Sequence, residues 1–284
     1  MGESAVESVV GLPAPGLRPL VSRYIGYRME GFAPRLHRGL PSRHVTLVIS
    51  LAAPIHVAGM PDPARPAGGH YAALAGGLHA APVTIAMDGR DRGIHLELTP
   101  AGARALLGLP AGAIAWDVVD LADLLGPESA SLVDRLACAP TWADRFAILD
   151  AVLARRVRGG VRMPEEVGWA WRRLVVSGGL LPVSELAGEV GWSRRHLAER
   201  FRDEIGLAPK VAARVMRFQR ACRMLQRPRR AALAEVAAAC GYYDQAHLTR
   251  EWNELAGCTP TLWMAEELPS VQDAGAGPDA GCAA

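Results

Sequence analysis

Cysteines and long apolar runs are both scarce in this chain of 284 residues. The five cysteines are scattered and form no Cys-x-x-Cys pair, so neither disulfides nor a cysteine zinc site is expected. No run reaches the roughly 18 apolar residues that a membrane-spanning helix needs. Residues 1–16 lack the basic start and apolar core of a signal peptide. These absences predict a cytoplasmic protein without a membrane partner.

Lysine is almost absent from the sequence. Lys210 is the only lysine, and arginine supplies the remaining positive charge. Residues 194–230 hold twelve basic and three acidic side chains, a net charge of +9, which leaves −7 for the rest of a chain whose total is +2. A basic segment within an otherwise acidic chain predicts a polyanionic partner for that segment alone. Arginine also suits bidentate contacts with phosphate and guanine.

Short β-branched runs alternate with turn-forming clusters before residue 100, which predicts a small antiparallel sheet or barrel. The runs cover residues 44–49, 55–57, 83–87 and 94–98, with a Pro- and Gly-rich loop at 58–69. Residues 1–20 are punctuated by glycine and proline and are expected to be loose. Helical patterns begin at Thr99-Pro100, where Thr99 can cap a helix that starts with Pro100.

The clearest helix of the N-terminal half covers residues 141–157, after a shorter one at 127–137. Its apolar stripe, formed by Trp142, Phe146, Leu149 and Leu153, is more typical of a core face than of a partner surface. A plausible linker at 158–160 precedes further helical patterns over 164–267, and residues 269–284 hold too few large apolar groups to fold. We therefore predict an α+β chain with a β-rich domain at 1–160, an all-helical domain at 161–268 and a disordered tail at 269–284.

The helical domain repeats itself at an offset of 50 to 51 residues. Three groups recur in the same order: Leu186-Ala187-x-x-Val190-Gly191 as Val236-Ala237-x-x-Cys240-Gly241, His196-Leu197 as His247-Leu248, and Gly206 with Pro209 as Gly257 with Pro260. A repeated supersecondary unit is the simplest explanation.

Each copy is predicted to be a helix, a tight turn and a second helix. Gly191 and Gly241 supply the backbone freedom that the two turns need. Ser184 is expected to cap the first helix of unit one, and Ser193 and Asp244 to cap the second helix of each unit.

The second helices turn a polar face outward, which is typical of helices that contact bases in the major groove. Arginine can contact guanine, glutamine can contact adenine, and alanine or a threonine methyl group can touch thymine. The predicted base-contacting residues are Arg194, Arg195, Ala198, Glu199 and Arg202 in unit one, and Gln245, Ala246, Thr249 and Arg250 in unit two. The predicted phosphate contacts are Ser193, Arg214, Arg217 and Asp244. A solvated basic face is the alternative for the arginines between the units.

At these residues the chain resembles the AraC family of bacterial transcription regulators. The resemblance covers about residues 164–266 and is most specific from Gly241-Tyr242 through Thr259-Pro260. It implies two helix-turn-helix subdomains joined by a long helix, with recognition helices in successive major-groove segments of double-stranded DNA. Three positions depart from the family pattern. Trp252 stands where Phe is usual, and Met264 stands where the family often has Arg. Glu199 occupies a position that is commonly basic. Glu199 could instead accept a hydrogen bond from cytosine N4, so the target sequence stays open.

The N-terminal half resembles the sensor half of some actinobacterial AraC-type regulators at residues 23–27, 35–42 and 76–79. This resemblance implies a cupin-like antiparallel sheet or barrel followed by dimerising helices, and it leaves a small-molecule effector and a homodimer open. A metal-dependent cupin-like domain is the alternative, but the sequence lacks the close His-x-His pair with a later Glu and His that most cupin metal sites use. We therefore expect no metal or cofactor, and structural or surface roles for the histidines of this half: His37, His44, His56, His70, His79 and His95.

A DNA-targeted enzyme with a helix-turn-helix module is the alternative to a regulator. DNA-alkylation repair proteins of this kind need a cysteine-rich zinc site near the N-terminus, whereas the first cysteine here is Cys138. The chain also lacks a Gly-x-Ser-x-Gly elbow, a phosphate loop and a His-Glu-x-x-His motif. We therefore predict a non-enzymatic, sequence-specific transcription regulator. An architectural binder without sequence preference is a third alternative. Effector, target genes and the choice between activation and repression stay open.

Arg250→Ala is predicted to weaken binding to the specific duplex by about 1–3 kcal/mol, because it removes a candidate bidentate contact with a base. Titration of promoter DNA measures this change, and an unaltered affinity would contradict the role of the helix.

Footprinting tests specificity itself, since a protein that prefers its own promoter no more than random DNA is not a sequence-specific regulator.

Overall fold

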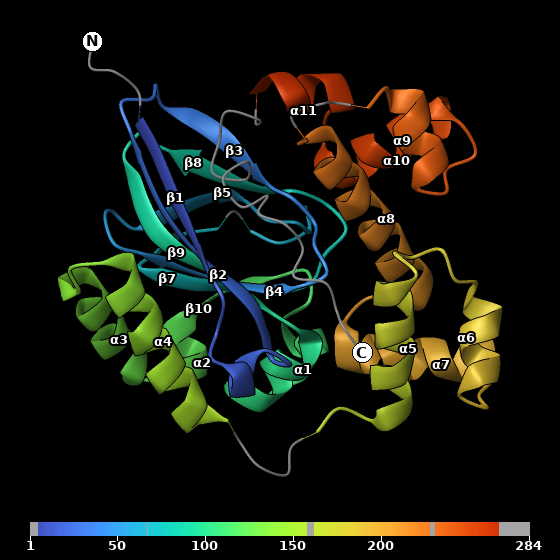
Figure 1. Cartoon of the computed structure of the whole chain (residues 1–284), viewed down its shortest axis with the longest axis horizontal. Helices are drawn as coiled ribbons and strands as arrows, with labels where there is room; N and C mark the ends of the chain where they lie inside the picture. The colour runs from blue at the N-terminus through green and yellow to red at the C-terminus, as the bar shows by residue number, and fades with distance from the viewer. Residues whose placement is uncertain (1–4, 67, 158–161, 228–230, 267–284) are drawn as a thin grey trace.

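The computed structural model describes residues 5–66, 68–157, 162–227 and 231–266 (Figure 1). They form a β-rich N-terminal region and a helical C-terminal region that lie side by side. The predicted linker at 158–160 and the predicted tail at 269–284 lie outside the described residues. Among the described helices, none combines the length and the apolarity needed to cross a bilayer.

Two antiparallel sheets build the N-terminal region. The larger has the order β1 (Ala5–Gly11), β2 (Val21–Glu30), β9 (Asp91–Leu98), β4 (Val45–Ser50), β7 (Ala73–Gly76) and β10 (Val118–Asp120). The smaller has the order β3 (Arg35–Gly39), β8 (Val83–Met87), β5 (Ile55–Gly59) and β6 (His70–Tyr71). No pairing among the described strands joins the two sheets into a closed barrel, so of the two predicted forms the structure has the sheets.

The expectation that residues 1–20 are loose is wrong for residues 5–11. Strand β1 pairs with β2 along its whole length, from Ala5 opposite Glu30 to Gly11 opposite Tyr24. Gly11 suggested a loop but is a packing site, because a Cβ atom there would lie 2.4 Å from Cδ2 of Phe146. The glycine therefore lets an aromatic ring from a distant helix lie directly on the strand.

Helix α4 (Trp142–Arg156), beside α3 (Glu128–Cys138), covers the outer face of the larger sheet (Figure 1). A capping box between Thr141 and Asp144 starts it. Leu149 and Leu153 are buried, and the Tyr24 hydroxyl donates a hydrogen bond of 2.8 Å to Asp150. The predicted stripe of this helix is thus a core face. Shorter elements complete the region: η1 (Pro15–Leu17), α1 (Pro100–Gly102), η2 (Ala103–Leu107), η3 (Ala111–Ile114) and α2 (Leu121–Leu125).

Seven helices build the described C-terminal region, namely α5 (Glu165–Val176), α6 (Val183–Glu189), α7 (Arg194–Ile205), α8 (Pro209–Leu225), α9 (Leu233–Ala239), α10 (Gln245–Ala256) and α11 (Pro260–Glu266). The pairs α6–α7 and α9–α10 are the two predicted helix-turn-helix units, and the long helix α8 lies between them (Figure 1). The predicted double unit is confirmed.

The repeat holds at the level of individual backbone hydrogen bonds. Gly191 and Gly241 adopt left-handed φ angles of 71° and 73°. Directly after them, the amides of Trp192 and Tyr242 donate to the carbonyl groups of Ala187 and Ala237, both at 2.9 Å. A side chain at either glycine would strain this turn, so the same residue type recurs for the same geometric reason.

Three of the four predicted caps are confirmed, including Thr99, which accepts a hydrogen bond from the amide of Gly102 at 2.9 Å. Ser193 accepts a hydrogen bond from the amide of His196 at 3.1 Å, and Asp244 accepts one from the amide of His247 at 2.6 Å. The prediction for Ser184 is wrong, because α6 begins at Val183 after Pro182 and Ser184 lies inside the first turn. Pro182 occupies the cap position, so the helix begins two residues earlier than it would after a cap at Ser184.

Aromatic stacking forms the core around α8 and the second unit. The ring centroids of Phe218 and Trp252 lie 4.8 Å apart, and those of Trp252 and Trp263 lie 5.3 Å apart, both in edge-to-face arrangements. All three side chains are fully buried. Trp252 therefore joins α8 to α11.

The two regions meet where α7 packs against η2 and η3. Arg104 forms a two-pronged ion pair with Glu204, in which its Nε lies 2.9 Å from Oε2, and the Glu204 side chain is buried. A Cβ atom on Gly112 would lie 2.4 Å from the carbonyl oxygen of Asp203, so the two backbones are in close contact. The first recognition helix is thus anchored to the β-rich region at its C-terminal end.

Trp252→Ala is expected to lower the free energy of unfolding by about 3–5 kcal/mol, because it leaves a large cavity between Phe218 and Trp263. Tyr243→Ala is the matched control, since this aromatic side chain of the same unit is 92% exposed and its removal should cost less than about 0.5 kcal/mol. Urea unfolding followed by circular dichroism compares the two. Equal losses would contradict the described packing.

Candidate DNA-binding surface and inter-sheet cavity

The predicted base-contacting residues all lie on the solvent side of α7 and α10. Each helix buries one apolar face, through Leu197 and Phe201 in α7 and through Leu248 and Trp252 in α10. Ala198 and Thr249 are half-exposed. The other predicted residues are exposed, namely Arg194, Arg195, Glu199, Arg202, Gln245, Ala246 and Arg250. The fold therefore leaves both faces accessible to a duplex, while the contacts themselves stay predictions.

The arginines of these faces differ in what they already bind. Arg195 pairs with Glu199 at 2.9 Å, one helical turn away. This pair keeps a positive charge beside the acidic side chain, so Glu199 repels a phosphate less than a lone carboxylate would. No ion pair within the described residues involves Arg194, Arg202 or Arg250. These three are the strongest candidates for direct contact with DNA.

Two arginines of α8 that were predicted to bind phosphate have intramolecular partners. Arg214 pairs with Glu251 at 3.0 Å and also with Glu254, and Arg217 pairs with Glu251 at 3.4 Å. The Arg217 guanidinium also lies 5.6 Å from the ring centroid of Tyr242. The sequence predicted phosphate contacts, with a solvated basic face as the alternative. In the structure both side chains tie α8 to α10, the second recognition helix. A phosphate would have to compete with Glu251.

Ser193 and Asp244, the other predicted phosphate contacts, have side chains that are engaged as helix caps. Both nevertheless lie at exposed N-termini of recognition helices, where free amides favour an anion. Their contacts with phosphate stay predictions.

Tyr243 is a surface residue that the sequence interpretation missed. It is 92% exposed and directly precedes the cap of α10. The signal was in the repeat, because the offset grows from 50 to 51 residues between Gly241 and His247. One extra residue therefore lies in the second turn, and the turn presents an aromatic ring to solvent.

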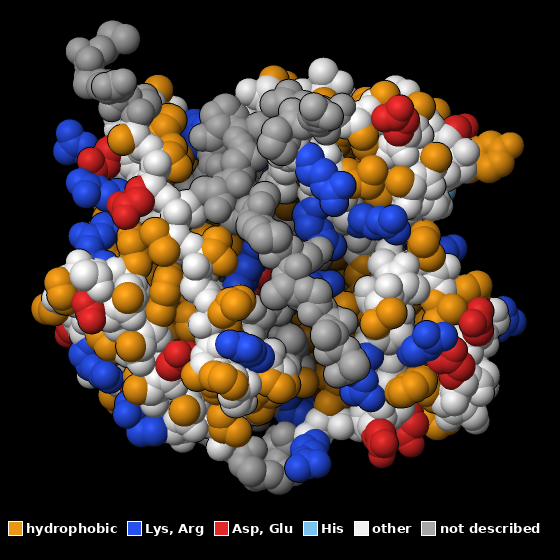
Figure 2. Space-filling model, viewed as in Figure 1, with side chains coloured by type: hydrophobic (Ala, Val, Ile, Leu, Met, Phe, Trp, Pro, Cys, Tyr) orange, Lys and Arg blue, Asp and Glu red, His pale blue; other side chains and the backbone are white. Residues whose placement is uncertain are grey.

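Figure 2 shows Lys and Arg side chains gathered on the visible face of the helical region, close to its border with the β-rich region. Positive charge of this kind favours approach of a polyanion.

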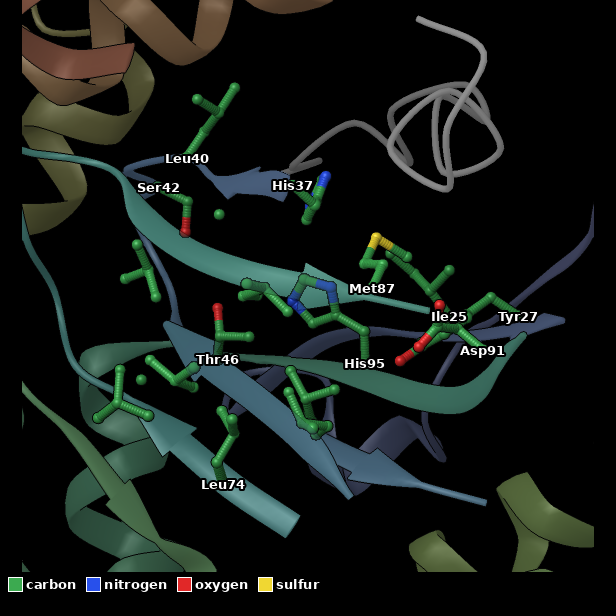
Figure 3. Close-up of a pocket in the computed structure, with 18 of the residues that line it drawn as sticks. Ile25, Tyr27, His37, Leu40, Ser42, Thr46, Leu74, Met87, Asp91 and His95 are labelled. Atoms are coloured by element: carbon green, nitrogen blue, oxygen red, sulfur yellow. The ribbon is translucent and has the colours of Figure 1, made fainter. Parts of the chain in front are cut away.

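A cavity of about 620 Å³ lies between the two sheets (Figure 3). Strands β2, β4, β7 and β9 form one wall, and β3, β5 and β8 form the opposite wall. A cluster that links the sheets, Val57, Leu74, Val83 and Val118, borders the cavity on one side. Another part of the wall comes from the helical region: Phe218, Gln219, Cys222, Arg223 and Gln226 near the end of α8, and Trp263 of α11.

A buried polar cluster lies beside the cavity on the larger sheet. Arg23 donates to Glu97 at 2.8 Å, and Nδ1 of His44 lies 3.3 Å from the other oxygen of Glu97. Burial would raise the pKa of Glu97, but His44 and Arg23 outweigh it and hold this pKa at about 2. Burial lowers the pKa of His44 to about 4, although Glu97 opposes the shift. At neutral pH the cluster therefore holds an ionised carboxylate beside a neutral imidazole.

Most histidines of the β-rich region line the cavity, namely His37, His56, His70, His79 and His95. Their gathering was not predicted, because they come from different strands and loops. In the described part of the chain they do not combine with Cys, Asp or Glu into a group of three or more that could hold a metal ion. His56 and His70 instead stack their rings at a centroid distance of 4.3 Å.

The comparison with known proteins agrees with this two-part architecture. A sequence model of the family described as "Helix-turn-helix domain" matches residues 186–266. No curated protein matches the chain. The crystal structure of ToxT from Vibrio cholerae O395 superposes with a TM-score of 0.50 at 8% identity and covers 92% of this chain and 97% of that one. The two chains thus share a fold in which helix-turn-helix units follow a β-rich region.

Two further solved structures are similar over part of the chain. The DNA-binding domain of AdpA, a global transcriptional factor solved in complex with a target DNA, has 23% identity and a TM-score of 0.33, and covers 37% of this chain and 97% of that one. The AraC-like transcriptional activator CuxR has 14% identity and a TM-score of 0.28, and covers 75% of this chain and 86% of that one.

The free energy of unfolding is expected to fall as the pH drops from about 6.5 to about 4. Burial lowers the pKa of both His44 and His79 to about 4, so the unfolded chain binds these protons first. Each histidine accounts for up to about 1.4 kcal/mol per pH unit within this window. Urea titrations between pH 4.5 and 6.5 measure the slope before most carboxylates are protonated.

His79→Gln should make that slope shallower, because one buried titrating group is lost. Equal slopes for wild type and His79→Gln would contradict a buried neutral His79.

Proposed function

We infer that this chain, a DNA-binding transcription regulator of the AraC type, changes its affinity for DNA when a small molecule occupies the cavity between its two sheets. One observation carries the proposal, namely that the cavity wall combines strands of the β-rich region with α8 and Trp263 of the DNA-binding region. A molecule bound there would contact both regions at once.

On the DNA side, we propose that α7 and α10 enter the major groove of double-stranded DNA. Arg194, Arg202 and Arg250 are the first candidates, because the described part of the chain offers them no ion pair. Thr249 donates its hydroxyl to the carbonyl oxygen of Gln245 at 2.9 Å. Its hydroxyl is therefore already satisfied, which favours a role for its methyl group, as in contact with thymine.

Two packing contacts support transmission from the cavity to the second recognition helix. Phe218 lines the cavity and contacts Trp252, and Trp263 also lines the cavity and contacts Trp252 from α11. Trp252 belongs to α10, on the side opposite the proposed base-contacting residues. A ligand that displaces the ring of Phe218 or Trp263 would therefore shift α10, because close-packed aromatic side chains cannot move without moving their neighbours.

We propose ligand sensing for residues 1–160 and DNA binding for residues 161–268, in a non-enzymatic cytoplasmic protein without a metal or cofactor. A homodimer through α4 or a neighbouring helix is compatible with the fold, in which α4 covers the sheet opposite the cavity. Because two helix-turn-helix units occur in one chain, binding of DNA as a monomer is equally compatible.

A side chain that fills the cavity should act as a built-in ligand. Thr46→Trp places an indole in the cavity, since Thr46 lines it from β4. We expect the dissociation constant for promoter DNA to change by about 5- to 150-fold in either direction, the usual range of coupling between sites. Fluorescence anisotropy on the full chain measures the change.

Thr84→Trp is the matched control, because Thr84 lies on β8 between the cavity-lining Val83 and Ile85 and does not itself line the cavity. It should leave DNA affinity within about twofold, well below the usual coupling. A folded Thr46→Trp variant with wild-type affinity would refute the coupling.

A further inference from the structure

We propose that the inter-sheet cavity selects an apolar molecule carrying one hydrogen-bond donor group, a hydroxyl or an amine, and that Asp91 and His95 bind that group. The proposal uses the cavity of the proposed function and adds the chemical class of its occupant. It does not depend on how the occupant changes DNA binding.

Asp91 and His95 lie on the same face of β9. Side chains alternate along a strand, so residues 91, 93, 95 and 97 all face the cavity side of the larger sheet. Position 93 is a glycine, and a Cβ atom there would lie 2.6 Å from the hydroxyl of Tyr27. The Tyr27 side chain therefore fills the gap between the two polar residues. Figure 3 shows Asp91 and His95 directed into the space between the sheets.

Both side chains carry a buried atom that lacks a partner. These atoms are Oδ2 of Asp91 and Nε2 of His95, and neither has a hydrogen-bond partner within the described part of the chain. Such atoms destabilise a fold unless something satisfies them. Because both belong to cavity-lining residues, a bound molecule can supply the missing partner.

Glu97, the third polar side chain on this face of β9, differs from the other two. Its carboxylate already accepts a hydrogen bond from Arg23 and lies 3.3 Å from Nδ1 of His44. The polar group of the ligand is therefore expected at the Asp91 end of the cavity.

The charges around Asp91 favour a donor over an anion. Burial and the nearby Asp88 raise the pKa of Asp91, and His37 and Arg35 oppose that shift without bonding to its Oδ2. Burial also lowers the pKa of His95, which favours a neutral imidazole whose free nitrogen can accept a hydrogen bond. An anionic headgroup would meet two carboxyl groups and no protonated imidazole at His95, whereas a hydroxyl or amine finds acceptors.

The rest of the wall suits an apolar body. Ile25, Met29, Val48, Leu74 and Ile85 line the cavity from both sheets. A volume of about 620 Å³ lies within the range of about 300–1,000 Å³ that is usual for small-molecule sites. Apolar side chains of both sheets therefore line the same cavity as Asp91 and His95.

Three probes of equal chain length separate the headgroups: 1-decanol, decylamine and decanoate. Each is titrated against the purified full chain, decylamine and decanoate below their micelle concentrations and decanol below its solubility limit. Binding is followed by calorimetry and by the shift in melting temperature. We expect decanol or decylamine to bind at least tenfold more tightly than decanoate. Tightest binding by decanoate, or no binding by any probe, would overturn the proposal.

Asp91→Asn and His95→Phe should each weaken binding of the preferred probe at least tenfold, and Asp91→Asn should affect decylamine more than decanol. Glu30→Gln is the matched control, because Glu30 is an exposed carboxylate next to Met29, the strand partner of Asp91. It should change affinity less than twofold. Wild-type affinity in a folded Asp91→Asn variant would also overturn the proposal.

DNA affinity measured on the same samples keeps the two proposals distinct. Selective probe binding that leaves DNA affinity unchanged would support the ligand class and count against the coupling. An effect of Thr46→Trp on DNA affinity, together with no probe binding, would support the coupling and refute the ligand class.

Discussion

Helix α8 packs against helices of both helix-turn-helix units and also borders the inter-sheet cavity, and the arrangement of the molecule follows from this. One side meets the turn before α6, where a Cβ atom on Gly179 would lie 2.2 Å from the carbonyl oxygen of Ala213. Another side meets α10 through Phe218 and Trp252. The end of the helix borders the inter-sheet cavity through Cys222. Any change in its position therefore affects the DNA-binding units and the cavity together.

The two helix-turn-helix units are held to the rest of the protein in different ways. The first is anchored to the β-rich region by a polar contact, the buried pair of Arg104 and Glu204, and by close backbone packing. The second depends on aromatic stacking through Trp252 and on ion pairs from α8. The apolar contact of the second unit lies next to the cavity, whereas the first unit has a polar anchor. A molecule in the cavity would therefore affect the second unit more directly.

Counting charges along the sequence overstated how much positive charge faces DNA. The segment 194–230 carries a net charge of +9, but Arg214 and Arg217 neutralise acidic side chains of α10, and Arg195 pairs with Glu199. The acidic partners of Arg214 and Arg217 lie outside that segment. The basic surface is consequently narrower than the sequence suggests, and Arg194 and Arg202 contribute a larger share of its positive charge.

The sequence by itself determined the double helix-turn-helix, because each unit depends on local features: a left-handed glycine in each turn, a side-chain cap on each second helix, and apolar spacing of one helical period. It also predicted the antiparallel strands and the core stripe of α4, again from local periodicity. Only the tertiary structure decided that residues 5–11 form a strand, that Gly11 is a packing site, and that Asp91 and His95 face one cavity. These outcomes depend on contacts between residues far apart in the chain, and no local pattern records which strand or helix will lie opposite.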